Sequence, residues 1–476
     1  MLLLLLFLTV YNPEYWQIYP SIERIHSITF GSRELYMGVP GGIYILDRAS
    51  LRLRRTLTSL DGLQGDVQLC AFLPGRNLLY VSTSGHLYEY LRATDVLLEL
   101  SPPFTQVKSI GITSEVAWFD TDRGTFRRVR SAQQFEPAQP PATGIRWYGE
   151  RDTTKPWAYP VLTPHYIVDR QLERYDLTHV WADPEGRRLY ATTLGYGVAV
   201  FDPHTGFLHR RVAPGPSSNR INRAFLAEGG IWFLGDDRIE TIDSLGNWEH
   251  TRIGGTRLIP LGSNRILAAI SRLRFPSQLT SLISDSTGLL LSSREEIYQL
   301  NPSGVLVSLA DLLNPESAIR SLGINAIWRH RDSLLIGTDR GLFLSTSDTL
   351  MHLADPFGRF DWGVFDILQT SDGDLFFSTL GGIVKMTQAD TWAHLIPPGY
   401  SLNIPIRRLA NGGDYVFFSY GSSIGAYNRR LDSWHTLPPA NQLPWSNVQL
   451  LHADSNSVWF SAVGFVGRCH FRSVLP

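Results

Sequence analysis

The chain has 476 residues, and its 43 Lys and Arg nearly balance its 44 Asp and Glu. Because it carries no basic field of the kind that a nucleic-acid backbone attracts, we predict no nucleic-acid partner. Aromatic residues make up 12% of the chain, including 13 Trp, and the length exceeds what one apolar core usually organises.

The chain begins with an almost wholly apolar stretch, MLLLLLFLTV. It is too short to cross a bilayer as a helix, and it lacks preceding basic residues and an A-x-A cleavage site. We interpret residues 1–10 as a signal peptide or a truncated leader, which predicts a secreted or periplasmic protein. An N-terminal hydrophobic strand or a wrong start codon is the alternative, and it predicts a cytoplasmic protein. No other run of 18 apolar residues occurs, so no integral membrane segment is expected beyond the leader.

One short pattern recurs along the chain, and residues 370–386 (TSDGDLFFSTLGGIVKM) show it most clearly. An Asp-Gly turn leads into an apolar strand, a Gly-Gly pair permits a tight hairpin, and a second apolar strand returns. The same pattern occurs in order at 34–47, 78–90, 188–202, 230–243, 331–345, 414–428 and 456–471. In the four copies nearest the C-terminus, which include 370–386, the strand-ending positions are 41, 41 and 42 residues apart: Thr338, Thr379, Tyr420 and Ala462.

A period of roughly 40 residues with four short strands predicts the blades of an all-β, β-propeller protein. Counting hairpins gives 11–12 four-stranded blades, including irregular ones near 107–178 and 254–279. Because a ring usually holds about four to eight blades, we predict two rings of five to seven blades; one large ring is the alternative. The expected division is a first propeller at 11–255 and a second at 256–476, with the junction in the run 254–279.

The two ends of the chain complement each other. The segment 14–28 resembles 433–449, in which an outer strand with Trp is followed by a Pro-containing loop. The N-terminal strand at 14–19 lacks three partners, while 447–471 supplies three strands without a fourth. We predict that both ends share one blade, which would remove two exposed strand edges.

The repeat, which joins a D-G turn, an apolar Trp or Phe pair, a Gly-Gly hairpin and an apolar run, resembles the two-component regulator propeller repeat. Residues 325–346 and 366–387 match it best, and weaker similarity extends over about 25–471. The resemblance implies a β-propeller that serves as an extracytoplasmic sensor region. Similar double propellers are accessory factors in bacterial secretion. The strand Ile231-Trp232-Phe233 is also similar to one in streptogramin lyases.

No motif in the chain is specific for catalysis. Cys70 and Cys469 fall in different blades, which predicts two buried thiols rather than a disulfide or a zinc site. Cys469 and His470 are adjacent in a strand, so their side chains point to opposite faces and cannot act as a dyad. We predict no catalytic residue, no metal site and no cofactor.

Propellers commonly bind ligands at the mouth of the axial channel, where hairpin loops converge. Loops between second and third strands, and loops that enter the next blade, offer aromatic residues beside Asp and Arg, which suit sugars or peptide segments. We predict that ligand binding involves Asp122, Arg123, Tyr196, Asp237, Asp339, Arg340, Trp362, Tyr420 and Trp445.

These observations favour a non-enzymatic extracytoplasmic module that binds a glycan or a protein partner at a channel mouth. The alternative is a propeller lyase or hydrolase with an acid/base pair at that mouth, which would place His, Glu or Asp with perturbed pKa values in the channel. An intracellular scaffold is the third interpretation, if the apolar start is an artefact.

Overall fold

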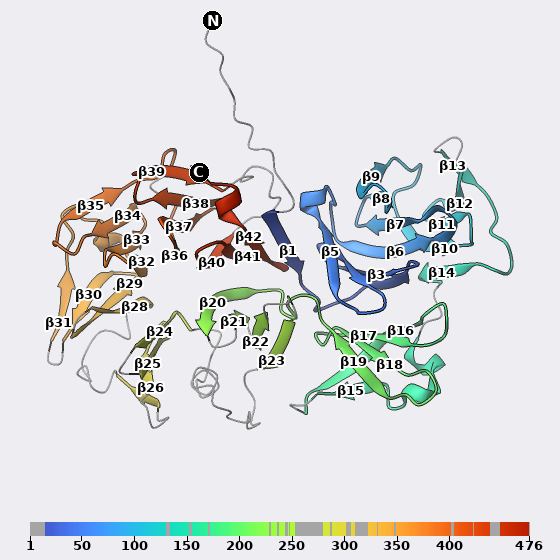
Figure 1. The fold of residues 1–476 in the computed structure, drawn as a ribbon, viewed down its shortest axis with the longest axis horizontal. Helices are drawn as coiled ribbons and strands as arrows, with labels where there is room; N and C mark the ends of the chain where they lie inside the picture. Colours follow the sequence, from blue (N-terminus) through green and yellow to red (C-terminus); the bar gives the residue numbers. More distant parts are fainter. Residues whose placement is uncertain are drawn as a thin grey trace, which may run out of the picture.

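The computed structural model of the chain describes most residues from 15 to 475; the ranges are 15–129, 134–151, 155–169, 172–227, 230–235, 238–242, 246, 248–252, 279–285, 288–300, 306–309, 322–330, 332–346, 349–400, 404–421, 423–437 and 448–475. In these ranges every regular element is a β-strand or a short 3-10 turn, and none is an α-helix. The strands form ten sheets arranged in two lobes (Figure 1). The described residues therefore form a β-propeller with two rings, as predicted, but with six and four sheets rather than the predicted 11–12 blades in rings of five to seven.

Six four-stranded sheets form the lobe drawn at the left of Figure 1, which we call the large ring. Its first strands contact one another from β24 round to β20, so they surround the ring axis, and an apolar cluster joins β21 and β22 to β25 and β26. The strands are β20 Ile221–Ala227, β21 Gly230–Gly235, β22 Arg238–Ile242, β23 Trp248–Arg252, β24 Ser281–Asp285, β25 Gly288–Ser292, β26 Ile297–Leu300, β27 Leu306–Ser308, β28 Ile324–His330, β29 Ser333–Thr338, β30 Gly341–Ser345, β31 Leu350–Leu353, β32 Val364–Gln369, β33 Leu375–Thr379, β34 Gly382–Met386, β35 Trp392–Leu395, β36 Leu409–Gly412, β37 Tyr415–Tyr420, β38 Ser423–Asn428, β39 Ser433–Thr436, β40 Gln449–Ala453, β41 Val458–Ala462, β42 Phe465–Cys469 and β1 Trp16–Pro20.

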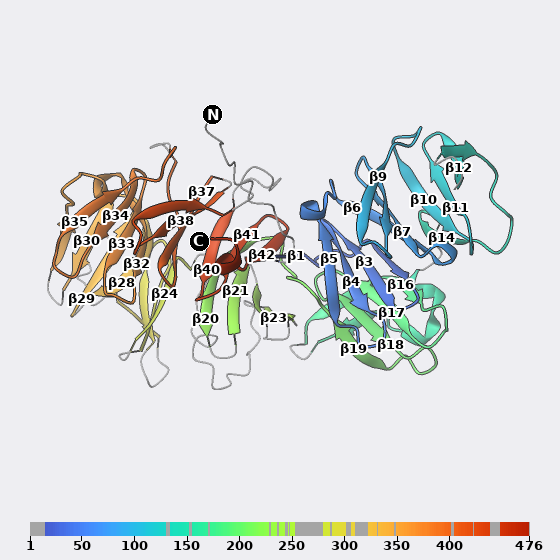
Figure 2. The ribbon, with the colours of Figure 1, turned by 45° about the horizontal axis from the view of Figure 1, so that its top comes forward.

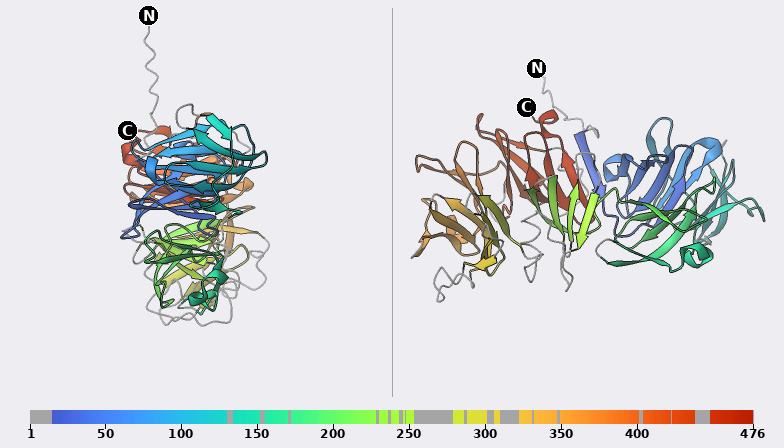
Figure 3. Two further views of the ribbon diagram at one scale, coloured as in Figure 1. Left: turned by 90° about the vertical axis from the view of Figure 1, so that its right-hand side faces the viewer. Right: turned by 60° about the horizontal axis from the view of Figure 1, so that its bottom comes forward.

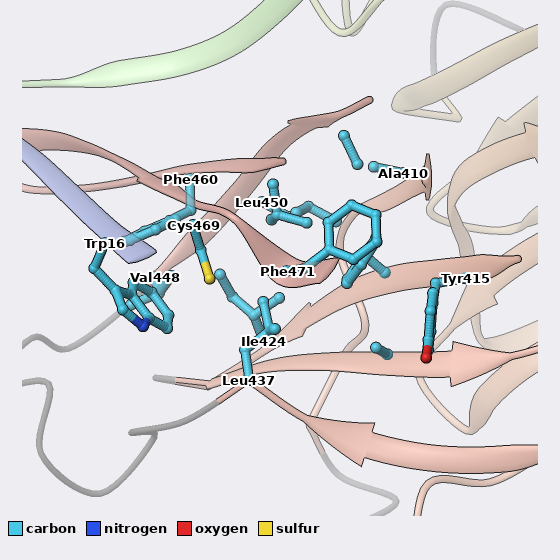
Figure 4. Close-up of a cluster of buried hydrophobic side chains, with 14 of the residues drawn as sticks. Trp16, Ala410, Tyr415, Ile424, Leu437, Val448, Leu450, Phe460, Cys469 and Phe471 are labelled. Carbon is cyan, nitrogen blue, oxygen red and sulfur yellow. The ribbon is translucent and has the colours of Figure 1, made fainter. Parts of the chain in front are cut away.

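The last sheet of the large ring is built from both ends of the chain. Strand β1 pairs antiparallel with β42, from Trp16 opposite Cys469 to Pro20 opposite Phe465. Trp16 packs edge-on against Phe460 with ring centroids 5.7 Å apart, inside the cluster shown in Figure 4. The predicted shared blade is thus confirmed, and it closes the ring by covering the edge of β42.

Four sheets form the other lobe, which we call the small ring. Apolar clusters join β2–β5 to β6–β9, β6–β9 to β10–β14, and β2–β5 to β15–β19. The strands are β2 Ser27–Phe30, β3 Glu34–Val39, β4 Gly42–Asp47, β5 Leu53–Thr58, β6 Val67–Leu73, β7 Leu78–Thr83, β8 Leu87–Leu91, β9 Val96–Leu100, β10 Val107–Ile112, β11 Ala117–Thr121, β12 Gly124–Val129, β13 Gln134–Pro137, β14 Arg146–Gly149, β15 Tyr166–Val168, β16 Arg174–Ala182, β17 Leu189–Thr193, β18 Val198–Phe201 and β19 Leu208–Val212.

The stretch near 107–178 is irregular, as predicted. Strands β10–β13 form a sheet to which β14 adds beside β10, and β15 adds to β16 of the next sheet, so two sheets have a fifth strand. Between them the chain forms 3-10 turns at Pro156–Ala158 and Pro160–Leu162, where proline supplies the fixed φ of such turns. The other irregular stretch, 254–279, lies almost wholly outside the described residues.

Two segments connect the rings, because the chain leaves the large ring after β1 and returns to it at β20. These linkers, residues 21–26 and 213–220, run side by side: Ile22 N–H donates to the Pro216 carbonyl at 2.7 Å. The sheet β20–β23 packs on the sheet of β1 and β40–β42 through Tyr19, Trp248 and Trp459, and Figures 2 and 3 show it within that lobe. We therefore infer that the small ring is inserted in the large one, with the junction at 213–220 rather than near 255.

The repeat at 370–386 shows how local sequence fixes a hairpin. Thr370 and Asp374 close the first turn, and β33 then pairs with β34 from Leu375 opposite Met386 to Thr379 opposite Gly382. Gly382 has φ +122°, and a Cβ there would lie 2.8 Å from the Leu395 carbonyl oxygen. Only glycine meets both conditions without strain.

Replacing Trp16 with alanine tests the closure of the large ring. Trp16 is buried against the last sheet, so W16A should lower the free energy of unfolding by about 3–5 kcal/mol, as large-to-small core changes do. The matched control is W157A in the small ring, where the side chain is 69% exposed and the change should stay within about 0.5 kcal/mol. Urea denaturation of both variants makes the comparison, and equal losses would contradict the proposed closure.

Candidate functional site

Two predicted ligand-binding residues of the small ring, Asp122 and Arg123, form hydrogen bonds within a loop. The Asp122 carboxylate accepts hydrogen bonds from the backbone N–H groups of Thr105 and Gln106 and from the Thr105 hydroxyl. These bonds, led by the Gln106 N–H, hold the pKa of Asp122 below its ordinary value. Arg123 Nη1 donates to the Pro103 carbonyl at 2.8 Å. Both side chains are exposed, but their polar atoms are engaged within the loop.

Four of the other predicted residues lie on one face of the large ring. Asp339 follows β29, forms an ion pair with Arg294 of the neighbouring sheet, and accepts a hydrogen bond from Asn325 Nδ2 at 2.9 Å. Arg340 is exposed beside it, and its backbone N–H donates to the Thr338 hydroxyl. The β29–β30 hairpin thus carries an ion pair that joins two sheets.

The next loop along this face contains the 3-10 turn Phe360–Trp362. The Arg359 guanidinium lies over the Trp362 ring, 5.1 Å from its centroid, and Trp362 is 48% exposed. A side chain added at Gly381 would meet Arg359, so this loop reaches the next hairpin. The turn itself is held by the buried Asp355, whose carboxylate accepts the Phe360 N–H at 2.6 Å.

The face continues with two tyrosines. Tyr400 donates its hydroxyl to the Leu380 carbonyl at 3.2 Å and packs edge-on against Tyr420, with centroids 6.1 Å apart. Tyr420 ends β37 and also stacks on Phe418. We call this set the loop-face arc; it comprises Arg294, Asp339, Arg340, Arg359, Trp362, Tyr400 and Tyr420.

The remaining predicted residues lie elsewhere. Asp237 and Trp445 are outside the described residues. Tyr196 is almost buried in the small ring, where it packs against Tyr175 with centroids 5.0 Å apart. It lines a cavity between the two rings and not a channel mouth.

This cavity, the inter-ring cleft, has a volume of about 680 Å³. The small ring contributes residues of β4, β5, β15 and β19, and the large ring contributes β23 (Figure 1). Its lining is Leu46, Leu51, Leu53, Val168, Asp169, Tyr196, Leu208, His209, Arg210, Arg211, Val212, Ala213, Pro214, Gly246, Trp248, Glu249 and His250.

Glu240 lies behind this lining with no exposed side-chain area. Its Oε1 accepts the Ser217 and Ser218 backbone N–H groups and the Ser217 hydroxyl, at 2.8–3.0 Å. Its Oε2 has no hydrogen-bond partner. Burial outweighs these bonds and raises the pKa of Glu240 to about 8, so the carboxyl is mostly protonated at neutral pH.

His250 lies next to Glu240, with Nδ1 3.8 Å from Oε2, and its side chain is 4% exposed. Burial, together with the charges of Arg211 and Arg238, holds the pKa of His250 well below its ordinary value. Neither ring nitrogen has a hydrogen-bond partner. The cleft therefore has a neutral imidazole beside a neutral carboxyl.

Arg211 supplies the nearest positive charge in the lining. Its Nε donates to the Tyr196 carbonyl at 2.7 Å, and its guanidinium lies over the Tyr196 ring at 4.3 Å. Burial lowers the pKa of Arg211 from its ordinary value, but an arginine side chain stays charged at neutral pH. Among the described carboxylates, that of Asp169 acts on Arg211 electrostatically and favours its charged form.

The axis of the large ring holds a second set of charges. Asp366 of β32 accepts the Leu409 N–H at 2.9 Å, and its Oδ1 is 3.6 Å from Arg408 Nη1. Burial raises the pKa of Asp366 to about 6 and lowers that of Arg223, on the opposite sheet, to about 10. Arg408, the ion-pair partner of Asp366, is always charged. The two side chains therefore form an ion pair and do not pass a proton between them.

Within the described ranges, no three His, Cys, Asp or Glu side chains gather as metal ligands would. Nor does any helix in those ranges have the length and apolar character needed to cross a bilayer. Both cysteines are buried free thiols.

Sequence reasoning missed the inter-ring cleft and its residues Glu240, His250 and Arg211. Each lies in an outer or third strand, where the repeat predicts only side chains that pack in the core or face solvent. The one available signal is a glutamate at 240 within RIETI, facing the core where the pattern asks for an apolar residue.

No family model matches the chain, and no curated protein is similar to it. Among solved structures, it is similar to the extracellular domain of a hybrid two-component system protein from B. thetaiotaomicron, at 15% identity and a TM-score of 0.39, over 97% of this chain. The chain spans 63% of that domain. It is also similar to virginiamycin B lyase from Staphylococcus aureus, at 13% identity and a TM-score of 0.36, over 61% of this chain and 92% of the lyase.

A third similar structure is the β-propeller domain of Cps50 (Swd1) from Myceliophteria thermophila. The identity is 12% and the TM-score 0.35, over 61% of this chain and 96% of that domain. Likenesses at this level concern the fold and say nothing of a ligand.

The raised pKa of Glu240 predicts a pH dependence of stability. Between its unfolded pKa near 4.5 and its folded pKa near 8, the folded state binds a proton that the unfolded state has lost, so stability falls as pH rises. E240Q keeps the neutral form, so relative to wild type it should gain a few kcal/mol between pH 5 and pH 8.5. Urea unfolding at both pH values measures this. E249Q, at an exposed neighbour, should follow wild type, and identical pH profiles for E240Q and wild type would refute the assignment.

Proposed function

We propose that the protein is a non-enzymatic extracytoplasmic binding module that docks a protein partner on the loop-face arc of the large ring. The observation that carries this proposal is Trp362, which is 48% exposed while the Arg359 guanidinium covers its ring. Trp, Tyr and Arg dominate the binding energy of protein interfaces. The arc contains all three types: one Trp, two Tyr and three Arg.

The scaffold of the arc is stiff, which favours binding. Trp362 sits in a 3-10 turn tied to Asp355, and Asp339 is tied to both Arg294 and Asn325. Tyr420 is fixed by Phe418 and Tyr400. Ordering costs on association are therefore small, since these side chains already have partners that orient them.

The size of the arc favours a protein over a glycan. Its residues come from four successive sheets, beginning with Arg294 after β25 and ending with Tyr420 of β37. Specific protein interfaces typically bury about 800 Å² on each side, which requires a surface of several adjacent loops. A glycan bound at the same face is the other outcome of the test.

The extracytoplasmic location belongs to the same proposal. It rests on the apolar stretch at 1–10 and on the resemblance of the repeats at 325–346 and 366–387 to those of sensor propellers.

The test is affinity capture on the full chain, with extract of the native envelope and, in parallel, a glycan array. W362A should lower the affinity for the captured protein by about 10–100-fold, as loss of an interface tryptophan does. The control is W157A, at a tryptophan of the small ring that is 69% exposed, which should bind as wild type. Equal retention by both variants would refute the arc as the interface, and binding on the array alone would assign the arc to a glycan.

A further inference from the structure

We infer that the inter-ring cleft is a binding site for a small organic carboxylate, whose carboxylate group pairs with Arg211 and accepts a hydrogen bond from His250. This site is separate from the loop-face arc. It is built from both rings, with β19 on one wall and β23 on the other (Figure 1).

Arg211 brings a positive charge into the lining of the cleft. The guanidinium is partly withdrawn from water against Tyr196, and it uses Nε on a backbone carbonyl. Asp169 acts on this guanidinium electrostatically, and an anion that reaches it would add a charge-assisted hydrogen bond. The flat fork of an arginine side chain suits a carboxylate, which can accept two parallel hydrogen bonds.

Residues of the lining also contain buried nitrogen atoms without a hydrogen-bond partner. His250 Nδ1 and Nε2 and Trp248 Nε1 are buried without hydrogen-bond partners. Leaving a buried donor unpaired costs about 1–3 kcal/mol for each group. An acceptor placed between Arg211 and His250 would pair with one of these donors and so gain binding energy.

The charges around the cleft leave a small positive surplus. Arg210, Arg211 and Arg238 are positive, whereas Asp169 and Glu249 are negative. Asp169 already accepts the Glu173 N–H at 2.9 Å and the Tyr175 hydroxyl, and Glu240 is neutral at pH 7. The surplus is about one positive charge, which favours a monoanion over a dianion such as phosphate.

The cleft has the size of a small-molecule site, and part of its wall is apolar. A volume of about 680 Å³ lies in the range of small-molecule sites, about 300–1,000 Å³. Apolar side chains line much of the small-ring wall: Leu46, Leu51, Leu53, Val168 and Leu208. They would cover a carbon skeleton, so the anion is expected to be organic.

The test uses calorimetry on the full chain with matched probes: benzoate against benzamide, D-glucuronate against D-glucose, and inorganic phosphate. At least one carboxylate should bind at least 10-fold more tightly than its neutral counterpart. Benzoate and glucuronate distinguish an aromatic acid from a sugar acid. Phosphate binding as tight as that of both acids, or no preference for any carboxylate, would overturn the assignment.

Three variants locate the site. R211Q should weaken carboxylate binding at least 10-fold, while R187Q, at an arginine of the same ring with 79% of its side chain exposed, should leave it unchanged. R211K retains the positive charge without the planar guanidinium, so its carboxylate affinity should lie between those of R211Q and R187Q. This intermediate affinity separates lost recognition from lost folding. Equal affinities of R211Q and R187Q would overturn the site.

The pH dependence gives an independent readout. As pH rises from 6 to 9, ionisation of Glu240 places a negative charge behind His250, so carboxylate affinity should fall several-fold. The charged groups around His250 are Arg211 from β19, Arg238 and Glu240 from β22, and Glu249 on its own strand. E240Q should remove the loss above pH 8, and an unchanged pH profile in E240Q would contradict the role given to this pair.

Discussion

Pairing of β1 with β42 is the constraint on which the rest of the molecule depends. It joins Trp16–Pro20 to Phe465–Cys469 across almost the whole chain and completes the last sheet of the large ring. Because β1 lies before the small ring in sequence and β20 after it, closing the large ring also fixes both ends of the small one. Loss of the β1–β42 pair would therefore free the N-terminal end of the small ring from the large one.

The two linkers convert this topology into a defined junction. Ser21 donates to the Gly464 carbonyl, Gly464 to that of Asn219, and Ile22 to that of Pro216, all at 2.7–2.8 Å. Across the junction, Arg238 Nη1 donates to the Gly195 carbonyl at 2.9 Å, and the Tyr44 hydroxyl donates to Pro20. A cleft between two domains is usually variable in shape; here it is bounded by chain segments that hydrogen-bond to each other.

Buried ionisable groups concentrate where the fold can hold them in place. Glu240 is oriented by three donors of Ser217 and Ser218, at the point where the second linker enters β20. Asp366 and Arg223 occupy first strands of opposite sheets around the large-ring axis. Such groups cost folding free energy, and Glu240 lies directly behind the lining of the inter-ring cleft. The exposed loop-face arc, in contrast, offers recognition through aromatic area.

The sequence by itself determined the strands, the hairpins and the shared terminal blade, because alternating apolar runs, Asp-Gly turns and Gly-Gly pairs are local signals. Thr338 and Thr379 end strands as predicted, and Trp16 lies in the strand that closes the ring. Tertiary structure alone decided which sheets share a ring: residues 221–252 join the C-terminal sheets through Tyr19 and Trp459, contacts that no local pattern encodes. Tertiary structure also places Arg211 and His250 in the same cleft. These residues are about 40 positions apart in sequence, and they come together because one ring is inserted into the other.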